Sequence, residues 1–354
     1  MMIVAALLFA GPSAPVGAEI ERESGTFEVV DMHLHPGSLS RFSEGGREFV
    51  ISSLPPFVRA YAPSILNLLS DPYAEHIGIH AQTEMAGVDH AVLYAVYAPE
   101  TTGVFTNREL QAALTDERNV RDDGTPWAYG FASIDFVDFT DDEAEAERRL
   151  EALGSYFEGH PGLFIGIKLA HPHQQVAFDD EAYFGVYDVA AEYDVPVLLH
   201  TGFSPFPGTV DEPSHYDPTN LAALVADRPD VTFVLAHVGQ GDARATAAAL
   251  DLAAENDNVY LEVSALGSPL RIDEDGNDVE RSEPQLPSVM AAIAARSLTG
   301  KTLFASDGPQ SSGKVRSYLE DVLAAAEAGG WSEAQIRGLL SDNFHRVYLS
   351  GTDD

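Results

Sequence analysis

Two histidines separated by one residue, His33 and His35, end a short apolar run in the sequence Asp31-Met32-His33-Leu34-His35. Side chains alternate between the two faces of a β-strand, so both imidazoles would point to the same side. Two neutral imidazole nitrogens on one face are suited to binding one metal ion. The pattern predicts a pair of metal ligands, and a purely structural pair is the alternative for these two residues alone.

Four other apolar runs also end in a polar residue that is capable of chemistry. These residues are Lys168, His200, His237 and Asp307. A polar group buried at the end of an apolar strand destabilises the protein unless it has a partner. A structural role for all of them would require a separate buried partner for each. We therefore predict one shared metal site, whose ligands are His33, His35, His200 and Asp307.

Three imidazoles and one carboxylate suit Zn²⁺ first, and also Mn²⁺ or Fe²⁺, and they leave a position for water. The sequence contains no cysteine, which excludes thiolate ligands, disulfides and cysteine nucleophiles. Asp307 is predicted to bind the ion through one oxygen and to accept the proton of a metal-activated water with the other. It would then return that proton to the leaving group. The predicted cofactor is one divalent metal ion.

His237 is predicted to lie beside the metal without being needed to complete the ligand set. There it would act catalytically, as an acid or as an electrophile toward the substrate oxygen that gains charge. A fifth metal ligand is the alternative role for His237. Glu262, inside the seventh apolar run, is interpreted as a buried partner of Arg244 or Lys168.

Lys168 and His171 are the predicted substrate-binding residues. A lysine buried at this position would bind a substrate carboxylate. Two alternatives for Lys168 are carboxylation, which would let it bridge two metals, and an ion pair with Asp31 or another rim acid. His171 follows in the next loop, where a surface position without function is its alternative.

Apart from His171, the candidate site residues lie within or shortly after a regular series of eight apolar runs, mostly at their carboxyl ends. The runs span residues 27–32, 88–96, 127–134, 163–169, 196–200, 231–237, 259–263 and 303–306. Segments with helical periodicity lie between them, at residues 144–157, 181–193, 220–227, 243–256, 287–295 and 314–328. This alternation predicts a (β/α)8 TIM barrel, because the carboxyl ends of its strands meet at one rim. An open doubly wound sheet is the alternative, but its strand ends would lie too far apart to share an ion.

Two connections are longer than an ordinary strand-to-helix loop. Residues 36–87, after the first run, are predicted to form a helical cap over the rim, and an insertion packed on the barrel flank is the alternative. Residues 267–287, after the seventh run, are rich in Asp, Glu and Arg and predict a mobile rim loop.

A chain of 354 residues with 45% hydrophobic residues is long enough for one barrel domain, predicted over residues 19–354. The formal net charge of -36 argues against nucleic acid as a partner. The acidic balance, with only three lysines, predicts adaptation to high salt. An ordinary acidic surface is the alternative.

The N-terminal residues 1–18 begin with an apolar run and end with Val16-Gly17-Ala18, a small-residue pattern typical of a signal-peptide cleavage site. No basic residue precedes the run, so a packed or disordered extension is the alternative. Export to the periplasm or the medium is favoured slightly over a cytoplasmic location. No segment reaches the roughly 18 consecutive apolar residues of a membrane span.

Taken together, these motifs resemble the amidohydrolase superfamily, and more narrowly its amidohydrolase-2 branch, which includes enzymes similar to aminocarboxymuconate-semialdehyde decarboxylase. The resemblance covers residues 29–349 and includes the C-terminal motif Asp342-Asn343-Phe344-His345-Arg346. It implies a metal-dependent barrel enzyme with a small-molecule substrate, the same metal ligands and a catalytic His237. It also implies one metal even where a lysine such as Lys168 follows the fourth strand. Asn343 and Arg346 are interpreted as structural.

Two reactions fit this site. The first is hydrolysis of a C–N or C–O bond, in an amide, ester or lactone. The alternative is non-oxidative decarboxylation or hydration of a small carboxylated substrate. A decarboxylase needs cations for the carboxylate, and the predicted rim offers few, namely Lys168 and the candidates Arg59 and Arg271, so hydrolysis is favoured. A barrel that binds a ligand without catalysis is a third hypothesis, and a homo-oligomer stays open.

Overall fold

The computed structural model describes residues 20–22, 25–52, 54, 56–267, 271–272, 278–279, 285–309, 311 and 313–349. The predicted signal peptide at residues 1–18 and most of the loop after the seventh run lie outside these residues. Among the described residues, no helix combines the length and the apolar character needed to cross a bilayer.

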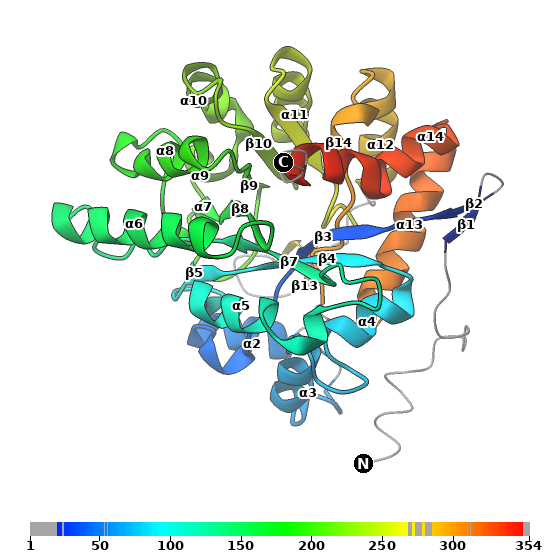
Figure 1. Ribbon diagram of the computed structural model, residues 1–354, viewed down its shortest axis with the longest axis horizontal. Helices are drawn as coiled ribbons and strands as arrows, with labels where there is room; N and C mark the ends of the chain where they lie inside the picture. The colour runs from blue at the N-terminus through cyan, green and yellow to red at the C-terminus, as the bar shows by residue number, and fades with distance from the viewer. Residues whose placement is uncertain are drawn as a thin grey trace.

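Eight parallel strands form the centre of the molecule (Figure 1), and each coincides with one of the eight apolar runs. In the order of the chain they are β3 (Val30–Leu34), β4 (His90–Tyr94), β7 (Ala128–Ala132), β8 (Phe164–Leu169), β9 (Val197–Gly202), β10 (Phe233–Gln240), β11 (Val259–Glu262) and β14 (Thr302–Leu303). Neighbours in this order are paired from β3 through to β14. The continuous apolar runs therefore predict the strands correctly.

The first and last strands approach each other, so the sheet is a nearly closed barrel. Met32 donates its backbone N–H to Phe304 at 3.3 Å, and His35 donates its own to Gly308 at 2.8 Å. The predicted (β/α)8 TIM barrel is confirmed, and the open doubly wound sheet is wrong.

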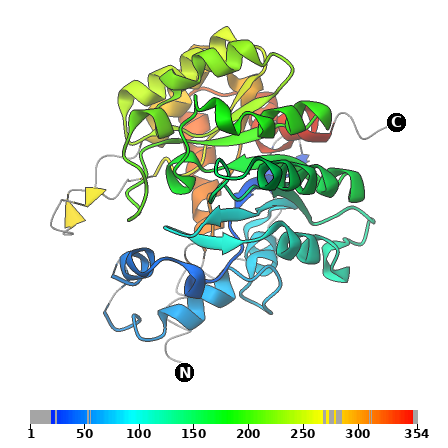
Figure 2. The same ribbon diagram turned by 90° about the vertical axis from the view of Figure 1, so that its left-hand side faces the viewer.

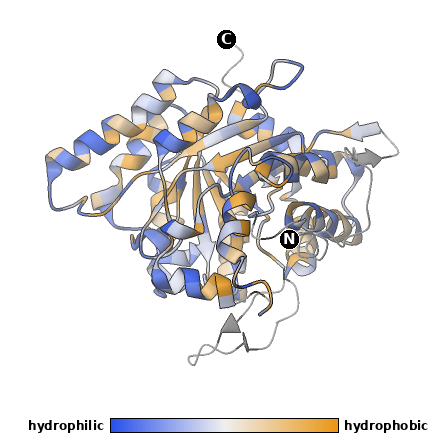
Figure 3. Ribbon diagram, turned by 90° about the horizontal axis from the view of Figure 1, so that it is seen from below, coloured by the Kyte–Doolittle hydropathy of each residue, from blue (hydrophilic) through white to orange (hydrophobic). Residues whose placement is uncertain are grey.

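Helices surround the barrel (Figure 2) and present their apolar faces to the strands. Those that follow the predicted periodicity are α6 (Glu143–Gly159), α8 (Gly185–Glu192), α10 (Ala222–Asp227), α11 (Ala243–Glu255), α12 (Leu286–Ala295) and α13 (Lys314–Ala328). Two more are α4 (Ile79–Ala86) and α5 (Asn107–Leu114). Colouring by hydropathy shows the apolar strands inside and polar helix faces outside (Figure 3), as expected for strands buried on both faces.

The C-terminal segment fills the end of the barrel opposite to the predicted site. Phe344 and Tyr348 pack in one cluster with the inward-facing Phe131. The ring centroids of Phe344 and Tyr348 are 5.3 Å apart, and those of Phe131 and Tyr348 are 5.0 Å apart. Asn343 is buried and donates to the backbone oxygens of Thr299 and Thr302 at 2.9 and 2.7 Å. Its contacts agree with the structural role that the sequence predicts.

The long connection after β3 contains α2 (Glu44–Ser52) and α3 (Ala62–Leu69) before it reaches α4. The α2 segment contacts the loop after β9, because the rings of Phe42 and Phe49 lie 6.0 and 5.1 Å from that of Phe206. Gly46 permits this approach, since a Cβ there would lie 2.8 Å from Cε1 of Phe206. The insertion therefore touches the rim on the side of β9.

Candidate metal centre at the carboxyl rim

Three of the predicted ligands converge at the carboxyl ends of the strands. The Nε2 atoms of His33 and His35 are 3.0 Å apart, and Asp307 Oδ1 lies 3.4 and 3.1 Å from them. His33 is fully buried, whereas the side chains of His35 and Asp307 are 39% and 22% exposed. The group is therefore open to solvent on the side of His35 and Asp307.

The orientation of His33 is fixed from behind by Glu262, at the end of β11. Its Nδ1–H donates to Glu262 Oε2 at 2.7 Å, and both side chains are buried. A carboxylate on one imidazole nitrogen directs the lone pair of the other nitrogen toward a metal. The predicted partnership of Glu262 with Arg244 is wrong, because Arg244 pairs with Asp217 instead.

His237 and His200 adjoin this group. The ring of His237 lies 5.1 Å from that of His33 and 4.6 Å from that of His200. Ser264 Oγ lies 2.7 Å from His237 Nδ1, which leaves Nε2 for the site. The ligand atoms within 4.8 Å of one another form two groups, His33 with His35 and Asp307, and His33 with His237 and Glu262. His200 belongs to neither group.

The donor set fits a divalent metal ion. Burial lowers the pKa of His33, of His200 and of His237, the last to about 3, so these imidazoles are neutral. Neutral imidazole is the form that binds metals. His200 Nε2 is also buried and has no hydrogen-bond partner among the described residues. Binding of a metal ion would satisfy this nitrogen, whereas a purely structural role would leave it without a partner.

Asp307 is kept as a carboxylate by its neighbours. Burial alone would raise its pKa, but the hydrogen bond from His35 and the charge of Lys314 lower the pKa below the usual range. A carboxylate next to two imidazoles supplies the negative charge that a divalent ion requires.

Two residues of the site adopt left-handed backbone conformations. The φ angle is 66° at His237 and 55° at Asp307. Residues other than glycine pay about 1–3 kcal/mol for such a conformation, and it is often found where a side chain must be aimed at a site. Gly202, after His200, has a φ of 90°, and a Cβ there would lie 2.3 Å from the backbone nitrogen of Gln240. The sequence around His200 must therefore turn on a glycine.

Lys168 is buried beside these ligands, with 3% of its surface exposed. Its Nζ has no hydrogen-bond partner among the described residues and lies 5.4 Å from the ring centroid of Tyr94. Burial lowers the pKa of Lys168, and the charges of Glu262 and Asp307 oppose that change. The alternative of an ion pair with Asp31 or another rim acid is wrong, because neither Lys168 Nζ nor Asp31 Oδ2 has a partner among the described residues.

Tyr94, at the end of β4, was not predicted from the sequence. Its ring lies 4.6 Å from that of His33 and 5.6 Å from that of His35, and its hydroxyl donates to the backbone of Met32. A tyrosine within an apolar run gives no signal that separates a site residue from a core residue.

The two histidines of the loop after β8 have different surroundings. His171 is 2% exposed and its Nδ1–H donates to the backbone oxygen of Val176 at 2.9 Å, so the alternative of a surface position is wrong. Its role in substrate binding stays a prediction. The residue that contacts a predicted ligand is His173, whose ring lies 5.3 Å from that of His200.

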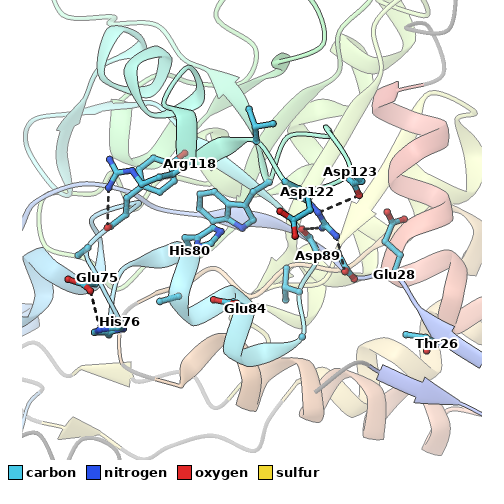
Figure 4. Close-up of a pocket in the computed structure, with 18 of the residues that line it drawn as sticks. Thr26, Glu28, Glu75, His76, His80, Glu84, Asp89, Arg118, Asp122 and Asp123 are labelled. Carbon is cyan, nitrogen blue, oxygen red and sulfur yellow. Dashed lines mark hydrogen bonds and ion pairs between the residues drawn. The ribbon is translucent and has the colours of Figure 1, made fainter. Parts of the chain in front are cut away.

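A separate groove of about 1070 Å³ lies on the flank of the barrel (Figure 4), and no predicted site residue lines it. His80 and Trp127 form part of its floor, with ring centroids 4.6 Å apart. Arg121 pairs with Asp89 at 3.6 Å and with Asp123 at 3.8 Å. The acidic side chains of the groove are therefore partly neutralised. None of the described residues that line it belongs to a group of close metal-ligand atoms.

The fold and this arrangement define a class of (β/α)8-barrel enzymes with a candidate divalent metal site at the carboxyl rim. The Amidohydro_2 (amidohydrolase) family model matches residues 30–349, and the chain belongs to this family. No curated protein matches the sequence.

Solved structures with the same fold have low sequence identity to the chain. An uncharacterized TIM-barrel protein from Bordetella bronchiseptica is 15% identical, with a TM-score of 0.59, over 90% of this chain and 98% of that chain. A 5-carboxyvanillate decarboxylase from Novosphingobium aromaticivorans, complexed with manganese and 4-hydroxy-3-methoxy-5-nitrobenzoic acid, is 13% identical, with a TM-score of 0.59, over 95% and 99%. A probable 2-pyrone-4,6-dicarboxylic acid hydrolase from Acinetobacter baumannii is 13% identical, with a TM-score of 0.52, over 90% and 98%. At these identities the likeness shows the fold alone.

Proposed function

We propose that the protein is a metal-dependent hydrolase that cleaves a C–N or C–O bond, in an amide, ester or lactone. The observation that carries this proposal is the convergence of His33, His35 and the Asp307 carboxylate, with His33 held by Glu262. In this proposal His33, His35, His200 and Asp307 hold one divalent ion, Zn²⁺ before Mn²⁺ or Fe²⁺. When bound, such an ion acidifies a water and polarises the substrate oxygen.

Proton transfer in this proposal belongs to Asp307 and His237. Asp307 accepts the proton of the attacking water and returns it to the leaving nitrogen or oxygen, so no proton is gained or lost overall. His237, whose Nδ1 is held by Ser264, acts through Nε2 on the oxygen that gains charge. In either of its roles, as acid or as electrophile, Nε2 must carry a proton.

Decarboxylation is the second candidate, and the buried Lys168 favours it. An ammonium group with no hydrogen-bond partner among the described residues suits a substrate carboxylate. Relatives in fold include a decarboxylase crystallised with manganese. The same carboxylate would also be present in a carboxylated lactone or amide, so Lys168 is compatible with both reactions.

Isotope labelling separates the two reactions. The purified protein, loaded in turn with Zn²⁺, Mn²⁺ and Fe²⁺, would be given a panel of lactones, amides, esters and aromatic carboxylates. Hydrolysis places ¹⁸O from labelled water in the product, whereas decarboxylation releases CO₂ and places solvent deuterium on carbon. We expect ¹⁸O incorporation that disappears in Asp307→Asn and persists in the flank variant Glu84→Gln. Release of CO₂ without ¹⁸O incorporation would overturn hydrolysis, and activity without bound metal would overturn the mechanism.

A further inference from the structure

His173 has a fixed position close to the predicted metal ligands. It belongs to the one-turn helix α7 (His171–Gln174), which follows β8 directly. Gln174 holds this turn, because its Oε1 accepts the backbone N–H of Ala170 and its Nε2 donates to the backbone oxygen of Ile134, both at 2.8 Å. The turn that carries His173 is therefore held by one hydrogen bond to its own start and by another to Ile134.

The hydrogen bond of His173 assigns its protonated nitrogen. Thr101 is fully buried, and its hydroxyl donates to the backbone oxygen of Ala98 at 3.4 Å. Thr101 Oγ1 lies 3.0 Å from His173 Nδ1, and we take it to accept from Nδ1–H because its own hydroxyl is directed to Ala98. In a neutral imidazole the second nitrogen then carries a lone pair and is an acceptor. Among the described residues, none donates to His173 Nε2.

The surroundings of the ring place it at the edge of the site. It meets His200 edge-on at 5.3 Å, and Phe206 lies 6.0 Å away. Burial lowers the pKa of His173, and the charges of Lys168 and His35 lower it further, whereas that of Asp307 raises it. Phe206 in turn contacts the insertion through Phe49. His173 thus stands between the predicted ligand His200 and the aromatic edge of the insertion.

We propose that His173 determines substrate specificity by accepting, at Nε2, a hydrogen bond from a hydroxyl or N–H of the substrate. The substrate class that fits is a flat carboxylated molecule with a hydrogen-bond donor near the reacting group. Lys168 then binds the carboxylate and Phe206 packs against the ring. This inference rests on the substrate-binding site of the proposed function, but it does not depend on which bond is broken.

Equilibrium binding tests the proposal without turnover. The probes are the 2-, 3- and 4-hydroxybenzoates, each compared with its methoxy analogue, which keeps the ring and the oxygen but lacks the donor. Binding to the Mn²⁺-loaded protein at pH 8 is measured by calorimetry. One neutral hydrogen bond predicts a preference of about 3- to 10-fold for at least one hydroxy isomer. We expect His173→Phe, which keeps a ring against His200 and Phe206, to lose that preference, and His80→Phe on the flank to keep it.

Thr101→Val provides a second variant that keeps His173. Without the acceptor on Nδ1, the ring can place its proton on Nε2 and become a donor there. The preference for the hydroxy analogue should then fall or reverse while metal content stays the same. The proposal is wrong if no isomer shows a preference in the original protein, or if His173→Phe retains it. Failure of the ¹⁸O experiment alone would remove hydrolysis and leave this result standing.

Discussion

Replacing Glu262 with glutamine tests whether the carboxylate behind His33 controls metal affinity. Glu262 is fully buried and its Oε2 accepts from His33 Nδ1 at 2.7 Å. Burial raises the pKa of Glu262, so its ionisation depends on a nearby positive charge. Glutamine keeps the size and an acceptor oxygen but cannot supply a negative charge behind His33 when a metal ion binds. Changes to such supporting partners cost about 10- to 100-fold in metal affinity. That loss corresponds to about 1.4–2.8 kcal/mol of binding free energy.

Competition with a chromophoric chelator would give the dissociation constants for Zn²⁺ and Mn²⁺ in both proteins. Metal analysis at saturation would give the stoichiometry, and Glu84→Gln on α4 is a matched control with an exposed acid. We expect the dissociation constant to rise by the amount above while the stoichiometry stays at one. An unchanged constant would refute the role of Glu262. Loss of the metal even at saturation would instead make Glu262 a ligand together with His237.

Three other perturbations have outcomes set by the structure. His237→Ala should keep the metal and lower kcat by about 10²- to 10⁴-fold, as metal analysis beside steady-state kinetics would show; loss of metal would make it a ligand. Glu28 Oε2 lies 2.7 Å from His345 Nε2, and this bond lowers the pKa of Glu28 and raises that of His345. The stabilisation needs Glu28 ionised and His345 protonated, so it disappears as pH falls through the lowered pKa or rises through the raised one. Glu28→Gln should therefore lower the free energy of unfolding most between about pH 4.5 and 6.5. The loss should be about 0.5–1 kcal/mol for this half-exposed pair. Thermal denaturation should show little difference between the two proteins at pH 9. Finally, a net charge of -36 predicts that 1 M NaCl raises Tm relative to 10 mM; no change would mean that self-repulsion is weak.

The sequence predicts the strands well, and marks the candidate ligands at their ends, for one physical reason. Strands buried on both faces must be continuously apolar, so a polar residue at the end of such a run is conspicuous. His33, His200 and Asp307 are found by this contrast alone. The barrel then brings the ends together, because parallel strands have all their carboxyl ends at one rim.

The supporting residues could not be predicted in the same way. Glu262 lies 229 positions from His33 in the chain, and their contact depends on which strands become neighbours across the barrel. His173 stands in the one-turn helix α7, where the direction of a side chain depends on the turn that Gln174 holds. The left-handed backbone conformation at His237 and Asp307 occurs at residues other than glycine, so the sequence does not indicate it.

The order of burial at the rim determines how a substrate would lie in the site. His35 and Asp307 are the exposed members, whereas Lys168 is 3% exposed and deeper. We expect a molecule that arrives from solvent to meet the exposed His35 first and Lys168 last. We therefore expect the carboxylate to occupy the deep end and the reacting bond to lie over Asp307. The rest of the substrate then extends toward Phe206, which makes the insertion the element that limits its length.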